Sequence, residues 1–119
     1  MALAWISGDT CVWKGSEKTP LCSVACQNII SEVLKENSLE EGISCIVTGN
    51  YEVGEMMTND SRIPLISATG SSKMGQIVGA TVAGRFGKSL LELGGNNAII
   101  ITPTADLKIV VPGLSLIHI

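Results

Sequence analysis

The chain has 119 residues, of which 45% are hydrophobic, 16% charged and 3% aromatic, and its formal net charge is −3. This length allows one domain at most, and the acidic balance without a Lys/Arg cluster argues against a nucleic-acid partner. The high apolar content predicts a core whose other half lies elsewhere, because so short a chain buries only about two-thirds of its unfolded surface. The opening MALAWISG resembles neither a signal peptide nor a membrane span, and no apolar run is long enough for one.

The chain contains four cysteines and a single histidine, His118. No two cysteines form a C-x-x-C pair, and this set argues against a zinc site. Cys22 and Cys26 lie four residues apart on an apolar helical face. We interpret all four cysteines as small buried hydrophobic residues in a reducing compartment, namely Cys11, Cys22, Cys26 and Cys45.

In chain order, residues 10–14 (TCVWK) predict a short strand that ends in a charge. A loop follows, and Thr19 and Pro20 then mark a helix start, with a capping hydroxyl and a proline at the first helical position. Asn37 marks the end of this helix. One face of it carries apolar residues at helical spacing, namely Cys22, Cys26, Ile29, Ile30, Val33 and Leu34.

The second half alternates strands and helices. Residues 43–48 and 63–68 predict strands, with a short helix at 51–58 between them, and residues 89–93 and 98–102 predict two more strands. A second helix, between the strands predicted at 63–68 and 89–93, carries apolar residues on one face, namely Met74, Ile77, Val78, Val82 and Phe86. Gly75 and Gly79 make one side of this helix small, so it can approach a strand or a ligand closely. Alternating elements with continuously apolar strands predict an α/β fold with a doubly wound, mainly parallel sheet covered on both faces.

In such a sheet, ligands bind beyond the carboxyl ends of the strands. Four successive strand ends carry groups that suit a nucleotide. They are Lys14 with Ser16 and Glu17, then Gly49, then Gly70 with Ser71, and last Glu92 with Gly94 and Gly95.

The segment ATGSSKMG is the sharpest phosphate-binding candidate. Gly70 allows a tight turn, and Ser71 and Ser72 stand at a helix N-terminus, where free N–H groups and the helix dipole favour an anion. The spacing from Gly70 to Gly75 is neither G-x-G-x-x-G nor a P-loop. An ordinary capped helix with a close-packing glycine is the open alternative.

Lys14 and Glu17, three residues apart, could hold the two hydroxyls of a ribose, and a solvated loop with unrelated charges is the alternative. Glu92 stands at a strand end with room beside Gly94 and Gly95 for a substrate or a water molecule. Partial burial there would raise its pKa toward neutrality and suit it to act as a general base. The alternative is an acid that caps a nearby loop.

Four segments in order, VWKGSEKTP, SATGSSKMG, LLELGG and NNAII, resemble the aldehyde dehydrogenase superfamily over residues 2–113. VWKGSEKTPL and SLLELGGNNAII look most like its α-aminoadipic semialdehyde dehydrogenase (antiquitin) branch. The resemblance implies a Rossmann-like fold without G-x-G-x-x-G, with residues 1–113 as part of the NAD-binding domain. It also implies oxidation of an aldehyde, such as a semialdehyde from lysine breakdown, to a carboxylic acid with NAD; NADP is the alternative cofactor.

The resemblance also assigns roles by position. Lys14 and Glu17 match residues that hold the adenosine ribose, Ser71 matches a serine facing the pyrophosphate, and the main chain of Leu93 matches one beside the nicotinamide. Glu92 matches the general base that activates the water hydrolysing a thioester. The full implied cofactor set is Lys14, Ser16, Glu17, Gly49, Gly70, Ser71, Ser72, Lys73, Met74, Gly75 and Leu93.

The sequence also departs from the family pattern. Ala68 stands where phenylalanine is frequent, and GNYEVG lacks a glycine-proline turn near the adenine, a space that Tyr51 would fill. None of the cysteines follows Glu92, so none matches the nucleophile, and we expect no turnover from this chain alone. The ending LSLIHI resembles translated adaptor sequence, which predicts a non-native tail at residues 114–119.

The resemblance implies that the parent enzyme is a homo-oligomer, either tetramer or dimer, with an aldehyde substrate. We expect it in the cytoplasm, or in mitochondria if a transit peptide precedes this segment. Two alternatives stay open: another Rossmann-type oxidoreductase, and a non-catalytic nucleotide-binding module.

Overall fold

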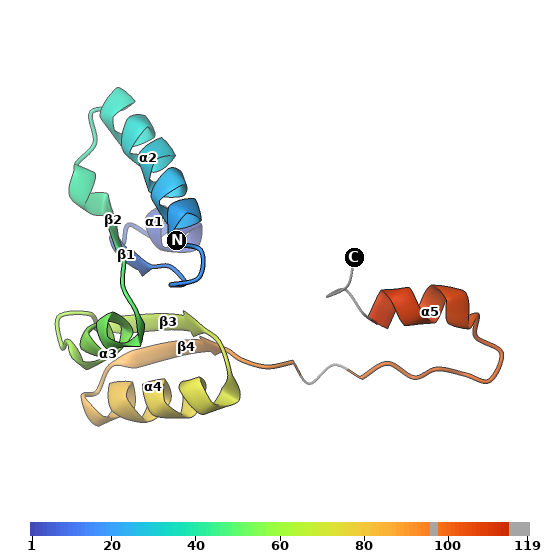
Figure 1. Ribbon diagram of the computed structural model, residues 1–119. Helices are drawn as coiled ribbons and strands as arrows, with labels where there is room; N and C mark the ends of the chain where they lie inside the picture. The colour runs from blue at the N-terminus through green and yellow to red at the C-terminus, as the bar shows by residue number, and fades with distance from the viewer. Residues whose placement is uncertain (96–97, 115–119) are drawn as a thin grey trace.

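The structure is a computed structural model that describes residues 1–95 and 98–114. Helices and strands alternate along most of the chain, as Figure 1 shows. In order, the elements are α1 (Ala2–Ile6), β1 (Cys11–Lys14), α2 (Pro20–Glu36), the 3-10 turn η1 (Glu41–Ile43), β2 (Ser44–Val47), α3 (Tyr51–Asn59), β3 (Leu65–Thr69), α4 (Ser72–Gly84), β4 (Lys88–Glu92) and α5 (Leu107–Leu114). This order confirms the predicted α/β class.

The strands form two parallel pairs. β1 pairs with β2, from Cys11 opposite Ser44 to Lys14 opposite Val47. β3 pairs with β4, from Leu65 opposite Lys88 to Thr69 opposite Glu92. Within the described residues no ladder joins one pair to the other, so the strands stand as two two-stranded sheets. All observed pairing is parallel, as the sequence predicts.

Helices α2 and α4 each pack on one strand pair. The side chain of Gln27 in α2 donates to the Ser44 main-chain oxygen at 2.8 Å and accepts from the Ser44 hydroxyl at 3.0 Å. On α4, a Cβ added at Gly79 would lie 3.4 Å from a methyl carbon of Leu91 in β4. The glycines therefore let α4 approach the strand closely, which confirms their predicted role.

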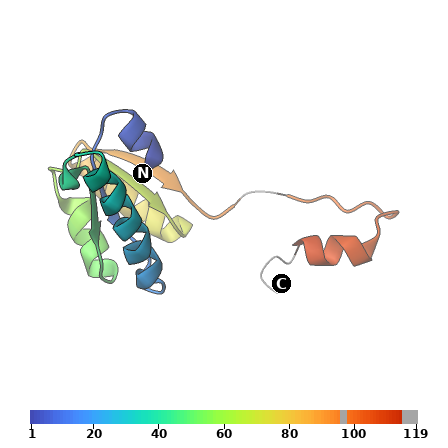
Figure 2. The same ribbon diagram turned by 90° about the horizontal axis from the view of Figure 1, so that it is seen from above.

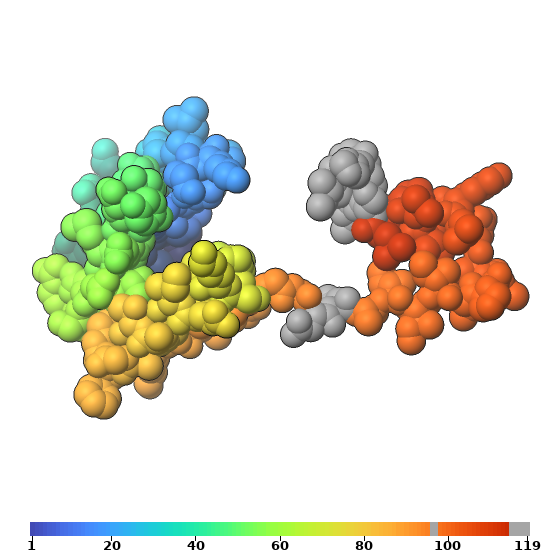
Figure 3. All heavy atoms as spheres, turned by 60° about the horizontal axis from the view of Figure 1, so that its bottom comes forward, coloured from blue at the N-terminus to red at the C-terminus, as the bar shows by residue number. Residues whose placement is uncertain are grey.

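Few apolar side chains are buried. Among the described residues the buried hydrophobic side chains are Leu34, Ile66 and Val82, and only Val82 is fully enclosed. The radius of gyration is 18.7 Å, whereas a compact chain of this length would have about 13–14 Å. Figures 2 and 3 show the reason, since α5 lies apart from the body formed by α1 to β4. The apolar composition thus exceeds what this core uses.

The prediction that the cysteines are buried is wrong for this chain. Cys22, Cys26 and Cys45 are exposed, and Cys11 is half-buried. On α2 the cause is the choice of packing face. The helix turns the polar Ser23 and Gln27 toward the strands, since Ser44 offers hydrogen bonds there. The cysteine end of the predicted apolar stripe therefore faces outward, whereas Leu34 at its other end is buried as predicted.

Several predicted elements also differ in detail. Residues 98–102 form no strand, because no neighbouring strand in the described chain offers them a hydrogen-bonding partner. The third strand begins at Leu65, one residue beyond Pro64, whose nitrogen cannot donate. Phe86 does not belong to the apolar face of α4. The helix ends at Gly84, and Phe86 lies beyond it, 98% exposed with a φ of 59°.

The sequence did not predict helices α1 and α5. Leu114 ends α5, while 115–119, most of the predicted non-native tail, lie outside the described residues. None of the helices in the described part of the chain has the length and hydropathy that crossing a membrane requires. The same residues hold no group of three or more His, Cys, Asp or Glu side chains placed to share a metal ion.

Candidate functional site

The predicted site residues fall into two groups, one at the carboxyl end of each strand pair. The first surrounds the end of β1, where Lys14 stands beside Val47 of β2. A small hollow opens there between the loop after β1, the loop after β2 and the start of α2. It is lined by Gly15, Ser16, Glu17, Pro20, Ser23, Thr48 and Gly49.

Lys14 and Glu17 meet at this end of the strand. The Lys14 side chain is 15% exposed, and its ammonium donates to the Gly15 carbonyl at 3.0 Å and lies 3.5 Å from Glu17 Oε2. Its carbon chain runs beside Gly54 of α3, where an added Cβ would lie 3.7 Å from Lys14 Cδ. The main-chain N–H of Glu17, and then the Lys14 ammonium, hold the pKa of the Glu17 carboxyl below its usual value. The carboxylate is therefore kept charged as a hydrogen-bond acceptor, as binding of ribose hydroxyls requires.

Ser16 and Gly49 shape the turns on either side. The Ser16 hydroxyl accepts from the Lys18 main-chain N–H at 3.2 Å, so it holds the loop. Gly49 has a φ of 155°, and a Cβ on it would collide with the Val53 side chain. The main chain can therefore turn straight from β2 into α3, where the Asn50 side chain accepts from the Glu52 N–H at 3.0 Å. These contacts give a sharp strand-to-helix turn at Gly49.

The second group joins the turn after β3 to the end of β4. Thr69 pairs with Glu92 in register, and the Gly70 N–H donates to the Glu92 main-chain oxygen at 3.0 Å. The Ser71 hydroxyl accepts from the Met74 N–H at 3.1 Å and so caps α4. Ser72 and Lys73 follow in the first helical turn, both exposed. The N-terminus of α4 thus presents free N–H groups, which is the arrangement that binds phosphate.

Leu93 and Gly75 lock this turn onto the strand end. A Cβ added at Gly75 would lie 2.5 Å from both methyl carbons of Leu93 and 3.0 Å from its Cγ. One residue further, a Cβ on Gly94 would lie 3.8 Å from the Ser72 hydroxyl. The sequence places Glu92 to Gly94 and the phosphate-binding candidate in separate segments, and the structure brings them together.

Glu92 itself is exposed. The partial burial that the sequence suggested for this carboxyl group is therefore absent, because nothing in the described chain covers the end of β4. Its main chain, in contrast, is fixed on the Thr69 side by the strand register and by the bond to Gly70. The structure positions the residue without enclosing its side chain.

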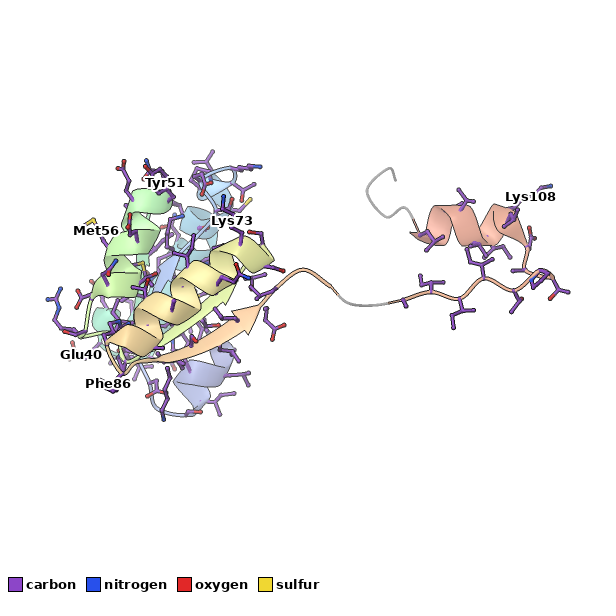
Figure 4. The ribbon with its side chains drawn as sticks, turned by 90° about the horizontal axis from the view of Figure 1, so that it is seen from below. Glu40, Tyr51, Met56, Lys73, Phe86 and Lys108 are labelled. Carbon is purple, nitrogen blue, oxygen red and sulfur yellow. The ribbon has the colours of Figure 1, made fainter. Side chains whose placement is uncertain are left out.

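Both groups open toward one end of the molecule. Figure 4 shows Tyr51, at the start of α3, and Lys73, at the start of α4, at the same end of the body, with Phe86 at the opposite end. Two helix N-termini and the ends of the β3/β4 pair therefore face the same way. Tyr51 is 73% exposed here, so a planar ring could reach it, but its predicted role beside adenine stays a prediction.

Sequence reasoning missed four residues that line the first hollow, namely Gly15, Pro20, Ser23 and Thr48. Ser23 is 4% exposed and lies so close to Gly15 that any side chain there would collide with its hydroxyl. The sequence signal for this contact was a pair of small residues, Gly15 in the loop after β1 and Ser23 in the first turn of α2. Together they allow the loop to approach the helix.

Comparison with known proteins decides the family. The family model described as the aldehyde dehydrogenase family matches residues 1–116. The chain belongs to the aldehyde dehydrogenase family. It is 50% identical over 113 residues to α-aminoadipic semialdehyde dehydrogenase of Mus musculus, covering 95% of this chain and 21% of that protein. It is 48% identical over 109 residues to aldehyde dehydrogenase family 7 member A1 of Pisum sativum, covering 92% and 22%. The predicted superfamily and branch are thus confirmed.

Solved aldehyde dehydrogenases share the fold. The Mycobacterium tuberculosis enzyme complexed with NAD⁺ has a TM-score of 0.72 and 37% identity, and the match covers 88% of this chain and 21% of that one. The NAD-dependent enzyme of Sinorhizobium meliloti has a TM-score of 0.74 and 30% identity, with coverage of 92% and 21%. The chain thus spans about a fifth of the length of these relatives.

Proposed function

We propose that this aldehyde dehydrogenase chain forms part of the cofactor cradle and carries the general base of an enzyme that oxidises an aldehyde to a carboxylic acid. The observation that carries the proposal is the bond from Gly70 to Glu92, together with the seating of Leu93 over Gly75. These contacts hold the main chain of Glu92 beside the N-terminus of α4, where an anion could bind. A bound cofactor must be held at its phosphates and at its reacting end at the same time, so the groups that hold the two ends must belong to one connected site.

The residues fit a nicotinamide dinucleotide. The free N–H groups at the start of α4 would hold the pyrophosphate, with the Ser71 hydroxyl already committed to the cap. At the other strand end, the Lys14 ammonium and Glu17 carboxylate would hold the ribose hydroxyls. Cofactor approach is helped by Gly49 and Gly75, whose missing side chains keep the main chain close to the neighbouring helix or strand. The bound cofactor would accept hydride from the substrate.

We propose NAD as the preferred cofactor. The Glu17 carboxylate is held charged by its own N–H and by Lys14, so it would attract a free 2′-hydroxyl and repel a 2′-phosphate. The Mycobacterium tuberculosis relative is described in complex with NAD⁺, which supports this choice. Glu17→Gln should therefore narrow the gap between NAD and NADP affinities.

Glu92 would take a proton from a water molecule so that the water attacks the acyl group formed from the aldehyde. In this family reaction the acyl group is carried by a cysteine, and none of the four cysteines follows Glu92 in the sequence. We therefore expect cofactor binding but no turnover from the isolated chain. The mouse relative is named for α-aminoadipic semialdehyde, and we propose an amino-acid semialdehyde as the substrate class of the parent enzyme.

Calorimetry with NAD tests the cradle. The chain should bind NAD, and Lys14→Ala should weaken binding by about tenfold, which corresponds to about 1.4 kcal/mol for one lost polar contact. Ser71→Ala should also weaken binding, because it removes the cap that holds the first turn of α4 in place. Lys35→Ala, in the last turn of α2 and outside both groups, is the matched control and should leave affinity unchanged. An equal loss of NAD affinity in all three variants would contradict a specific cradle. Reduction of NAD by the isolated chain in the presence of an aldehyde would contradict the conclusion that the chain lacks the nucleophile.

A further inference from the structure

The two cysteines of α2 face solvent side by side. Cys22 and Cys26 are both exposed and stand four residues apart in a 17-residue helix. The residue after each of them, Ser23 and Gln27, points toward the strands, where Ser23 is 4% exposed and Gln27 bonds to Ser44. Since one face of α2 is used for packing in this way, the cysteine pair is presented on the free side.

The helix places the two thiols within reach of a single atom. Side chains at positions i and i+4 are neighbours on a helix surface, with about 5–6 Å between their Cβ atoms. Each cysteine adds a flexible bond to sulfur, so both sulfurs can turn toward a centre between them. The pair suits a soft atom that can exchange two of its ligands for sulfur, because thiolate sulfur is a soft ligand and a strong nucleophile.

We propose that Cys22 and Cys26 form a dithiol site for trivalent organic arsenicals. In the reaction of an arsine oxide, R–As=O, each sulfur forms one As–S bond and the As=O bond breaks. The oxygen leaves as water with the two thiol protons. Arsenic stays trivalent, so the step needs no oxidant or reductant.

The surroundings favour an arsenical with an aromatic group. The stripe that begins with the cysteines continues along α2 through Ile29, 63% exposed, and Val33, 51% exposed. A phenyl group on the arsenic would lie against these side chains and remove apolar surface from water. The helical neighbours one turn from Cys26 are Cys22, Ser23, Ile29 and Ile30, none of which carries a charge.

The remaining two cysteines cannot form such a pair. Cys11 is opposite Ser44 in the β1/β2 ladder, and Cys45 follows Ser44 directly. Because successive side chains of a strand point to opposite faces, Cys11 and Cys45 lie on different faces of the two-stranded sheet. Cys11 and Cys45 therefore serve as an internal control, because their thiols cannot both bond to one atom.

The test titrates the reduced chain with phenylarsine oxide, followed by iodoacetamide and peptide mapping. One equivalent should give an adduct of one phenylarsenic group per chain with loss of one water, and it should protect Cys22 and Cys26 from alkylation while Cys11 and Cys45 stay reactive. Cys22→Ser and Cys26→Ser should each abolish the stable adduct. The double variant Cys11→Ser/Cys45→Ser should keep it at full occupancy.

A second variant tests whether the helix is responsible. Cys26→Ser combined with Val24→Cys moves the two thiols closer in sequence, two residues apart, but to different sides of α2. Loss of the adduct in this variant is expected. An adduct as stable as that of the unchanged chain would overturn the proposal, as would protection that falls on Cys11 or Cys45.

Discussion

Replacing Gly75 by alanine adds only one methyl group, but it should displace the end of β4 at the candidate site. The new Cβ would lie 2.5 Å from both methyl carbons of Leu93 and 3.0 Å from Cγ, so rotating the methyl groups does not relieve the contact. The side chain must move as a whole and take the end of β4 with it. Overpacking of this kind costs about 1–3 kcal/mol, while alanine gains about 1 kcal/mol over glycine inside a helix.

The balance is a net cost of up to about 2 kcal/mol, concentrated where Gly70 bonds to Glu92. A loss of 1–2 kcal/mol corresponds to a factor of about 5–30 in the local opening equilibrium. The assay is hydrogen exchange at the Gly70 amide, measured by NMR, with NAD calorimetry as a second readout. Exchange should accelerate by that factor, and NAD affinity should fall.

Gly79→Ala is the matched control, because the same helix receives the same substitution. Its Cβ would lie 3.4 Å from one methyl carbon of Leu91, which a small shift accommodates. This variant should therefore show the helix gain and no loss at Gly70. Leu93→Ala added to Gly75→Ala should restore slow exchange by making room. If Gly75→Ala behaves like Gly79→Ala, the contact with Leu93 does not position the strand end.

Three further predictions concern the rest of the chain. Phe86→Gly should slow amide exchange in the last turn of α4, because Phe86 is 98% exposed and its left-handed backbone costs about 1–2 kcal/mol that glycine avoids; Phe86→Ala should not. Hydrogen bonds from Arg62 lower the pKa of Asp60 to about 2, so Arg62→Gln should raise it toward 3.8 in an NMR titration, and the stabilising charge pair should be lost as pH falls from 3.8 toward 2. Gln27→Leu should cost about 1–3 kcal/mol in local stability by leaving the buried Ser44 hydroxyl unpaired, seen as faster exchange in β2, whereas Asn28→Leu on the exposed side should not.

Local signals gave reliable helix starts. Proline at position 20 does occupy the first helical position of α2, although the Thr19 hydroxyl makes no capping bond. Ser71 caps α4 as its place before the helix predicted. These features depend on a few neighbouring residues along the chain, so sequence alone can specify them.

Burial was harder to predict because it depends on distant neighbours. Helical periodicity identified an apolar stripe on α2 from Cys22 to Leu34, and Leu34 is buried as predicted. At the cysteine end, however, the helix packs through Ser23 and Gln27. The deciding partner is Ser44, which lies 17 residues beyond Gln27 and offers both a donor and an acceptor. Hydrophobic pattern gives no weight to such a pair, although a buried hydrogen bond can select one helix face over another.

The predicted strand at residues 98–102 shows the same dependence on a partner. Its apolar residues match strand preference, but a strand exists only where a neighbour receives its hydrogen bonds. Glu92 differs, because Thr69 and Gly70 provide that neighbour in β3 and in the turn after it. Strand-end position could therefore be derived from sequence for Glu92, while the burial of its side chain could not.

The position of the Glu92 main chain and the burial of its side chain would matter separately for the proposed role as a general base. A general base needs a fixed place and an environment that excludes bulk water, and the two come from different contacts. The bond from Gly70 and the pairing with Thr69 fix the main chain of Glu92 through groups within this chain. The exposed carboxylate takes its surroundings from whatever covers the end of β4. Substitutions at Gly70 or Gly75 should therefore move the main chain of Glu92, whereas groups that cover the end of β4 would set the surroundings of its carboxylate.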